Sequence, residues 1–124
     1  FGCLRNSGTS NTHGIMKQQQ ALDAFAALSQ ETRLAVFRLL VSAGPEGLAS
    51  GEIGERLNVR QNTMSTNLGI LLKAGLVDRV RDGRSVRYHA SHEGISGLLG
   101  FLLEDCCGGR PELCQPLIRE LSCN

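Results

Sequence analysis

The stretch Ile53–Ala90, which reads IGERLNVRQNTMSTNLGILLKAGLVDRVRDGRSVRYHA, decides the fold because its hydrophobic period changes halfway along. Its first part carries apolar residues at the spacing of one helix face, namely Met64, Leu68, Leu71 and Leu72. Gly75 then stands where a left-handed residue ends a helix. The remainder alternates between apolar and polar residues, and Asp82-Gly83 divides it into two runs. The stretch therefore predicts a helix followed by a β-hairpin.

Three further helices are predicted in front of this helix, at residues 18–29, 30–44 and 50–58. Two of them carry the apolar stripes of amphipathic helices, namely Leu22, Phe25, Ala26 and Ser29 in the first, and Leu34, Phe37, Leu40 and Val41 in the second. Ser29 and Ser50 are placed to cap the second and the third helix. Only Asn58 and Val59 join the third helix to the fourth, as a helix-turn-helix requires.

One more helix is predicted after the hairpin, in the sequence SHEGISGLLGFLLED at residues 91–105. Ser91 can cap it, and its apolar stripe comprises Ile95, Leu98, Leu99 and Leu102. That is more apolar surface than a terminal helix of one small domain needs. Two explanations stay open: a seam between two copies of the chain, or packing onto the body of the same subunit.

Basic residues are concentrated in the middle of the chain. Residues 56–90 hold seven basic and two acidic residues, whereas the segments on either side, 17–55 and 91–124, are net acidic. A basic middle between acidic flanks indicates a local footprint on a polyanion, although the whole chain carries a formal charge of only +1.

The fourth helix carries polar, uncharged residues opposite its apolar stripe, namely Asn62, Thr63, Thr66 and Gly69, with Gln61 at its N-terminal end. Asn and Gln side chains can bond adenine in two places, and a threonine methyl can meet the methyl of thymine. On the adjoining hairpin, Arg81, Arg84 and Arg87 could reach phosphates or the minor groove. The alternative to a DNA-reading face is a helix face that contacts only solvent, but such a face usually carries charged residues.

The order helix, short helix, helix and basic hairpin is that of a winged helix-turn-helix, so we expect a mainly α protein with a β-hairpin wing. Two stretches, QETRLAVFRLL and the one quoted first, resemble the ArsR/SmtB family of metal- and metalloid-responsive repressors, and the resemblance runs from about Ala21 to Leu103. It implies a homodimer that binds double-stranded operator DNA and releases it when an ion binds. It also implies that Gln61, Asn62, Thr63, Ser65 and Thr66 lie on the reading helix, that residues 81–87 form the wing, and that the first and last helices form the dimer interface.

The chain departs from common patterns of that family at the ion site. Many members carry a Cys-x-Cys pair at the start of the third helix, where this chain reads LASGEIGERL. Three of its five cysteines instead lie within nine residues, namely Cys106, Cys107 and Cys114. Thiolates select soft ions, and three of them suit trivalent arsenic or antimony, which take three sulfur ligands. Gly108-Gly109 supplies the backbone freedom that two adjacent cysteines need to converge.

Other interpretations of these cysteines stay open. They could form a redox switch, or bind zinc, cadmium or lead with Cys123, His92 or Asp105 as a further ligand. A structural disulfide fits poorly, because adjacent cysteines pair only in a strained ring, and incidental cysteines are rarely so concentrated. We expect that a bound ion, arsenite or antimonite, pins the tail to the last helix, repacks the dimer seam and changes the separation of the two reading helices.

The predicted organisation is one domain with two appendages. Residues 1–15 are interpreted as a cloning remnant or disordered leader, residues 16–105 as the DNA-binding and dimerisation domain, and residues 106–124 as a cysteine-bearing tail. No apolar run approaches the roughly 18 residues that span a bilayer, and no signal peptide opens the chain, so a cytoplasmic protein that does not bind membranes is expected. Enzymatic activity is not expected, because the chain has no Gly-rich phosphate loop and no Cys-x-x-Cys motif. A winged helix used only for protein contacts is a further alternative.

Overall fold

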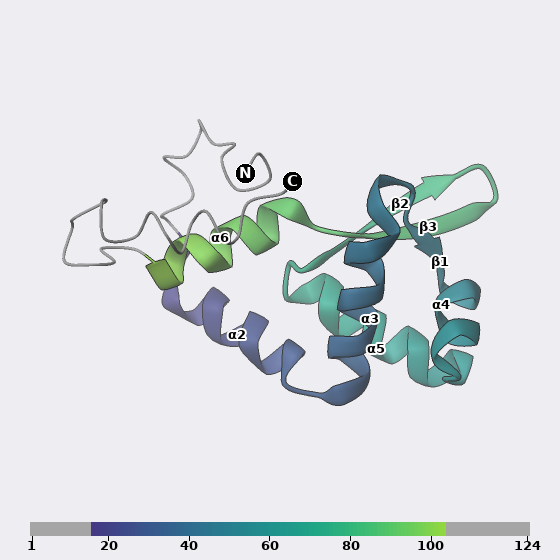
Figure 1. The fold of residues 1–124 in the computed structure, drawn as a ribbon, viewed down its shortest axis with the longest axis horizontal. Coiled ribbons are helices and arrows are strands. Elements are labelled where there is room, and N and C mark those ends of the chain that lie inside the picture. Colours follow the sequence, from purple (N-terminus) through teal and green to yellow (C-terminus); the bar gives the residue numbers. More distant parts are fainter. Residues whose placement is uncertain (1–15, 104–124) are drawn as a thin grey trace.

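A computed structural model describes residues 16–103 of the chain. The predicted leader, the cysteines Cys106, Cys107 and Cys114, and Cys123 all lie outside the described residues. The elements in chain order are α2 (Gln18–Leu28), α3 (Glu31–Ala43), the 3-10 turn η2 (Gly44–Glu46), β1 (Leu48–Ala49), α4 (Ser50–Leu57), α5 (Gln61–Lys73), β2 (Val77–Asp82), β3 (Ser85–Ala90) and α6 (His92–Leu103). Figure 1 shows the helices gathered beside a small sheet whose hairpin projects from the body. The predicted winged helix-turn-helix is confirmed.

The core lies where α3, α4, α5 and the start of β2 meet. Its largest fully buried side chains are Val36, Leu40, Ile53, Met64, Leu68, Leu71 and Leu76. Three of these come from the apolar stripe predicted for the fourth helix, so that prediction is confirmed. Since α5 is fixed by this buried side, its opposite side is the one left for solvent or a partner.

The stripe predicted for the first helix is wrong. The side of α2 that is buried carries three alanines, Ala21, Ala24 and Ala27, whereas Leu22 is 50% exposed and Phe25 is 39% exposed. Alanine at the contact lets α2 lie close to α3, α5 and α6, against all of which it packs. The larger apolar side chains of α2 are thereby left on the surface of the single chain.

The stripe predicted for the second helix is only half buried. Leu40 is in the core together with Val36, which the prediction did not include, while Leu34 and Val41 are exposed. Ser29 does not cap this helix either: its hydroxyl donates to the carbonyl of Ala26 at the end of α2, at 2.9 Å. The N-cap of α3 is Gln30, whose side chain accepts from the backbone N–H of Arg33.

Ser50 does not cap the third helix, because α4 begins at Ser50 and its N-cap is Ala49. The Ala49 N–H donates to the carboxylate of Glu52, at 3.0 Å. A carboxylate in the first turn satisfies a donor that the helix leaves free and also complements its dipole.

The hairpin prediction is confirmed with the turn one residue later. Asp82 pairs with Ser85, so the loop consists of Gly83 and Arg84. Gly83 has φ +67°, and a glycine with positive φ at the first loop position is typical of the type II′ turn. Sequence analysis missed β1, which pairs with β3 through Leu48 and Tyr88 and makes the sheet three-stranded, in the order β1-β3-β2.

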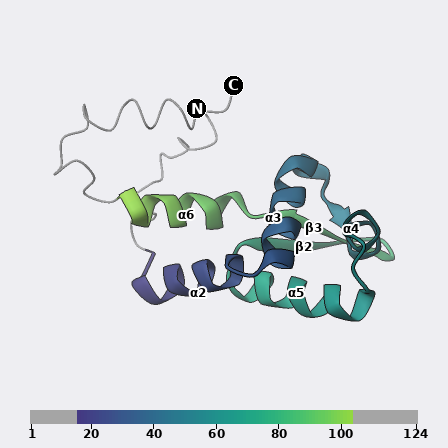
Figure 2. The same cartoon turned by 60° about the horizontal axis from the view of Figure 1, so that its bottom comes forward.

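The last helix lies alongside α2, as two views of the chain agree (Figures 1 and 2). The predicted cap is confirmed: the Gly94 N–H donates to the Ser91 hydroxyl oxygen, at 3.0 Å. Leu98 is buried, while Leu102 is 52% exposed. Within residues 16–103, none of the helices is long and apolar enough to cross a bilayer.

Candidate nucleic-acid interface

The turn between α4 and α5 has a tightly constrained geometry. Asn58 adopts the left-handed conformation at the end of α4, with φ 57° and ψ 49°, and the Val59 N–H donates to the Gly54 carbonyl at 2.9 Å. A Cβ on Gly54 would lie 2.5 Å from Gln61 Nε2 and 2.9 Å from the Val59 carbonyl oxygen. Only glycine therefore allows α4 and α5 to approach as they do.

Gln61 is held against α4. Its Nε2 donates to the Ser50 carbonyl oxygen, and the Ser50 hydroxyl donates to its Oε1, both at 3.2 Å. Gln61 is exposed, as expected of a residue at the start of a reading helix. Both the oxygen and the nitrogen of its side-chain amide are nevertheless hydrogen-bonded to Ser50 of the neighbouring helix. In this structure Gln61 therefore stabilises the packing of α4 against α5.

The face of α5 that sequence analysis singled out is exposed along its whole length. It comprises Asn62, Thr63, Ser65, Thr66 and Gly69. The Asn62 Oδ1 accepts from the Thr63 N–H at 2.8 Å, and the Thr66 hydroxyl donates to the Asn62 carbonyl at 3.2 Å. A Cβ added to Gly69 would have no neighbour within 4 Å. The face is thus polar, uncharged and free of bulk at its C-terminal end.

Two of the three predicted wing arginines are exposed on the hairpin. Arg81 lies on β2 opposite Val86, and Arg84 is in the turn at the tip. Arg79 precedes Arg81 by two residues and therefore lies on the same face of the strand. These guanidinium groups are available to an approaching anion.

The third arginine is bonded to other parts of the protein, although its side chain is 32% exposed. Arg87 Nε donates to the Glu46 carbonyl at 2.9 Å, and its Nη2 donates to the Gly47 carbonyl at 3.0 Å. The same Nη2 lies 3.7 Å from the Glu52 carboxylate. Arg87 therefore ties β3 to η2 and to α4. A sequence pattern could not reveal this role, because its partners lie about forty residues away in the chain.

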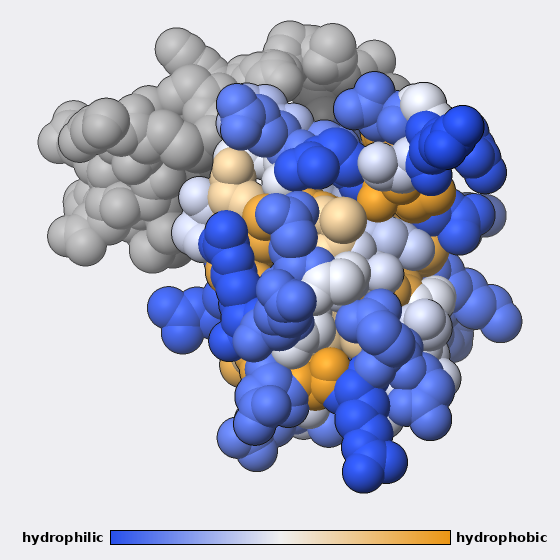
Figure 3. Space-filling model, turned by 90° about the vertical axis from the view of Figure 1, so that its right-hand side faces the viewer, coloured by the Kyte–Doolittle hydropathy of each residue, from blue (hydrophilic) through white to orange (hydrophobic). Residues whose placement is uncertain are grey.

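The end of the molecule that carries α4, β1 and the wing is mostly hydrophilic. Figure 3 shows blue surface over this face, with small separate apolar areas. A surface of this kind suits a hydrated, charged partner better than an apolar one.

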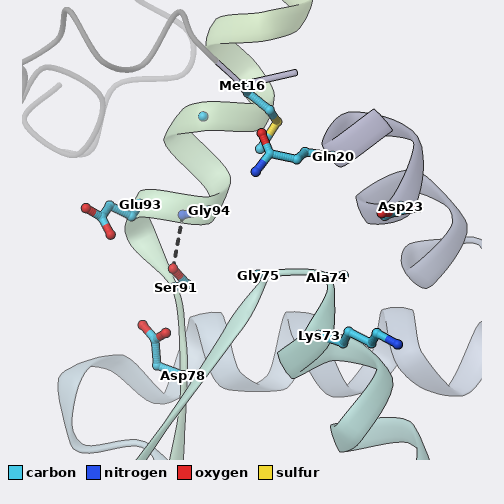
Figure 4. A pocket seen from close by; sticks show the side chains of 11 residues that line it. Met16, Gln20, Asp23, Lys73, Ala74, Gly75, Asp78, Ser91, Glu93 and Gly94 are labelled. Atoms are coloured by element: carbon cyan, nitrogen blue, oxygen red, sulfur yellow. Dashed lines mark hydrogen bonds between the residues drawn. The ribbon is translucent and has the colours of Figure 1, made fainter. Parts of the chain in front are cut away.

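A separate hollow of about 520 Å³ lies between α2, the turn after α5 and the start of α6. In Figure 4 the Lys73 side chain points away from the carboxylates of Asp78 and Glu93, so the charged groups of this hollow do not converge. Among the residues that the structure describes, there is also no group of three or more His, Cys, Asp or Glu that could hold a metal ion. The exposed face of α5 and the wing are therefore the candidate site.

An exposed polar helix, braced in a helix-turn-helix and flanked by a basic hairpin, defines a winged helix-turn-helix protein of the DNA-binding class. A sequence profile described as "Helix-turn-helix domain" matches residues 28–80. The chain belongs to the HTH-type transcriptional regulators, and its structural neighbours include an ArsR-like regulator. The family is one of DNA-binding regulators, in agreement with the prediction that the chain is not an enzyme.

Three curated relatives support this assignment. "Uncharacterized HTH-type transcriptional regulator YbzH" of Bacillus subtilis is 30% identical over 95 residues, which cover 67% of this chain and 95% of the relative. The B. subtilis regulator YceK, also named uncharacterized, is 43% identical over 61 residues, 49% of this chain and 60% of its own length. A Halobacterium salinarum protein named "Putative arsenical resistance operon repressor ArsR" is 38% identical over 76 residues, 61% of this chain and 58% of its length.

Solved structures agree with the fold. An ArsR-like transcriptional regulator from Rhodococcus sp. RHA1 superposes with a TM-score of 0.64 at 27% identity, covering 84% of this chain and 93% of that one. The homodimeric winged helix-turn-helix domain of Mb0332 from Mycobacterium bovis has a TM-score of 0.58 at 25% identity, covering 86% and 94%.

Proposed function

We propose that the protein is a transcriptional repressor that binds double-stranded operator DNA as a homodimer, with α5 of each copy in the major groove. The observation that carries the proposal is the uncharged polar face of α5, exposed beside a wing that presents Arg81 and Arg84. Hydroxyl and amide groups can both donate and accept hydrogen bonds, as the edges of base pairs require. The halobacterial relative, which is named a repressor, supports the same function.

The proposed base contacts come from Asn62, Thr63, Ser65 and Thr66, and the proposed phosphate contacts from Arg81 and Arg84. Gln61 and Arg87 support the same surface through bonds within the protein, since their polar groups are bonded to Ser50 and to the η2 region. This division separates residues that specify sequence from residues that shape the reading surface.

The proposed dimer interface is the apolar surface of α2 and α6. Leu22 and Phe25 on α2 and Leu102 on α6 are between 39% and 52% exposed in the single chain. The two helices lie side by side (Figure 2), and we propose that their exposed apolar side chains together contact a second copy. A structural neighbour described as homodimeric supports the formation of a homodimer.

The proposed inducer is trivalent arsenic, as arsenite, with antimonite as a second inducer of the same chemistry. The proposed ligands, Cys106, Cys107 and Cys114, lie outside the described residues, and the support is the chemistry of three thiolates together with the name of the halobacterial relative. A repressor with this role acts in the cytoplasm, where its operator is.

The test is a fluorescence-anisotropy titration on a duplex that the protein selects from a random-sequence library. Binding should weaken steeply with salt, because phosphate contacts release counterions, and arsenite should release the complex. Cys106→Ser, Cys107→Ser and Cys114→Ser should each keep DNA binding and lose arsenite release. Release by peroxide alone would identify a redox switch, and release by zinc, cadmium or lead but not arsenite would identify a different ion site. Salt-independent binding, or none, would leave only a protein-interaction role.

A further inference from the structure

A buried polar link joins the reading helix to the dimerisation helix. Asn67 lies on the buried side of α5, where it is only 7% exposed among apolar neighbours. Its Oδ1 accepts a hydrogen bond from Arg33 Nη1 at 3.1 Å. The same guanidinium donates from Nε to the carbonyl of Ala27 at 2.8 Å. One side chain at the start of α3 therefore holds both the last turn of α2 and the middle of α5.

Each of these hydrogen bonds satisfies a polar group that would otherwise lack a partner. Ala27 lies in the last turn of α2, where carbonyl groups lack a partner within the helix and where the dipole favours a cation. A buried amide such as that of Asn67 requires a hydrogen-bond partner. The planar, forked guanidinium can reach two acceptors in fixed directions, which an ammonium group cannot do. The backbone that carries Arg33 is held at the start of α3, because the Arg33 backbone N–H donates to Gln30 Oε1 at 3.0 Å.

The link restricts how α5 can turn about its own axis. Asn67 follows Thr66 directly and is one helical turn from Thr63, so holding Asn67 sets the direction of both reading side chains. The other end of the link is α2, which carries Leu22 and Phe25 on its exposed side. Rotation of α5 relative to α2 would move the reading face relative to the partner copy.

We propose that Arg33 and Asn67 are positioning residues that set the orientation of the reading helix relative to the dimerisation helix. They thereby set the half-site spacing that the dimer accepts. This inference rests on the proposed function. Half-sites lie about 34 Å apart, and one base pair adds about 3.4 Å, so a modest change of orientation is enough to blur the preferred spacing.

The experiment uses the full chain and an inverted-repeat duplex that wild-type protein selects from a random library. Two further duplexes have one base pair more or one fewer between the half-sites. The variants are Arg33→Met, Asn67→Leu and the double variant, in which neither polar partner is left unpaired in the core. Arg38→Met is the matched control, because Arg38 is an exposed arginine of the same helix. Dimer mass, melting temperature and salt dependence are measured for each protein.

Wild-type protein and Arg38→Met should prefer the selected spacing clearly. The double variant should stay dimeric and folded but bind the selected duplex about 5- to 150-fold more weakly, the range typical of coupling between sites. It should also discriminate little among the three spacings, with an unchanged salt slope. If the double variant keeps both wild-type affinity and wild-type spacing preference, the link is only structural and the inference is wrong.

Two other results are distinguishable from that failure. A salt slope reduced by about one phosphate contact in Arg33→Met, but not in Asn67→Leu, would mean that Arg33 contacts DNA directly, and it would overturn the positioning role. Absence of salt-dependent binding by wild-type protein would instead refute the proposed function, and the inference with it.

Discussion

Ser50 and Gln61 exchange two hydrogen bonds across the turn of the helix-turn-helix, one through the serine hydroxyl and one through its carbonyl. The side chain at the N-terminal end of the reading helix is thus bonded to the preceding helix. Replacing Gln61 by Ala should lower the free energy of unfolding by about 1 kcal/mol, as loss of partly exposed hydrogen bonds does. It should weaken binding to all duplexes alike.

Urea denaturation and a repeated library selection check this prediction. Ser50→Ala is the matched control, because it removes one of the same bonds from the other side and should shift affinity in the same direction. A selected motif that changes at one base pair in Gln61→Ala alone would show that Gln61 reads a base instead.

Two glycines of the interface should respond oppositely to alanine. Gly54→Ala should destabilise the protein by about 1–3 kcal/mol, because the added carbon would meet Gln61 and the Val59 carbonyl. Gly69→Ala should stabilise it by about 1 kcal/mol, since the site is open and alanine favours helix. Thermal or urea unfolding measures both. Gly69→Ala should also bind DNA more weakly if the helix backbone approaches a phosphate there, and an unchanged affinity would place Gly69 away from the DNA.

The salt dependence of DNA binding should distinguish the wing arginines that contact phosphate from the one that is bonded within the protein. Arg81→Ala and Arg84→Ala should each lower the slope of log affinity against log salt by about 0.9, the amount expected for one phosphate contact. Arg87→Ala should leave that slope nearly unchanged and lower stability, since its guanidinium bonds to the Glu46 and Gly47 carbonyls. Anisotropy titrations at four or more salt concentrations give the slopes. The opposite pattern would assign Arg87 to the DNA and the other two to solvent.

Phe25→Glu on α2 should convert the dimer into a monomer, because a charge would lie in the proposed apolar interface. Val80→Glu is the matched control, since Val80 is 50% exposed on β2, away from α2 and α6. Sedimentation gives the mass, and far-UV circular dichroism shows whether the helices remain. A dimeric Phe25→Glu protein, or a monomeric Val80→Glu protein, would require a different interface.

Sequence periodicity located α5 and the hairpin because each has a single strong signal. Met64, Leu68 and Leu71 recur on one helix face and are all buried, and Asp82-Gly83 falls close to the observed turn. It failed on α2, where the stripe read from the spacing of Leu22, Phe25, Ala26 and Ser29 is not the buried side. Ala21, Ala24 and Ala27 are buried because α2 packs closely, a tertiary property that leaves larger side chains outside.

Some features of the candidate site could likewise be predicted from the sequence, and others could not. Exposure of Asn62, Thr63 and Thr66 follows from their place opposite the apolar stripe. The bonds of Gln61 to Ser50, and of Arg33 to Asn67, depend on how helices approach one another. No local pattern encodes such contacts, so they emerge only from the three-dimensional arrangement.

The most direct test of the account is a library selection carried out in parallel with wild-type protein, Asn62→Ala and Thr66→Ala, with affinities measured at fixed salt. The account predicts that each variant keeps the wild-type salt slope but selects a motif relaxed at specific base pairs, at a cost of about 1–3 kcal/mol against the wild-type motif. Identical motifs and affinities for all three proteins would contradict the claim that this face of α5 reads DNA.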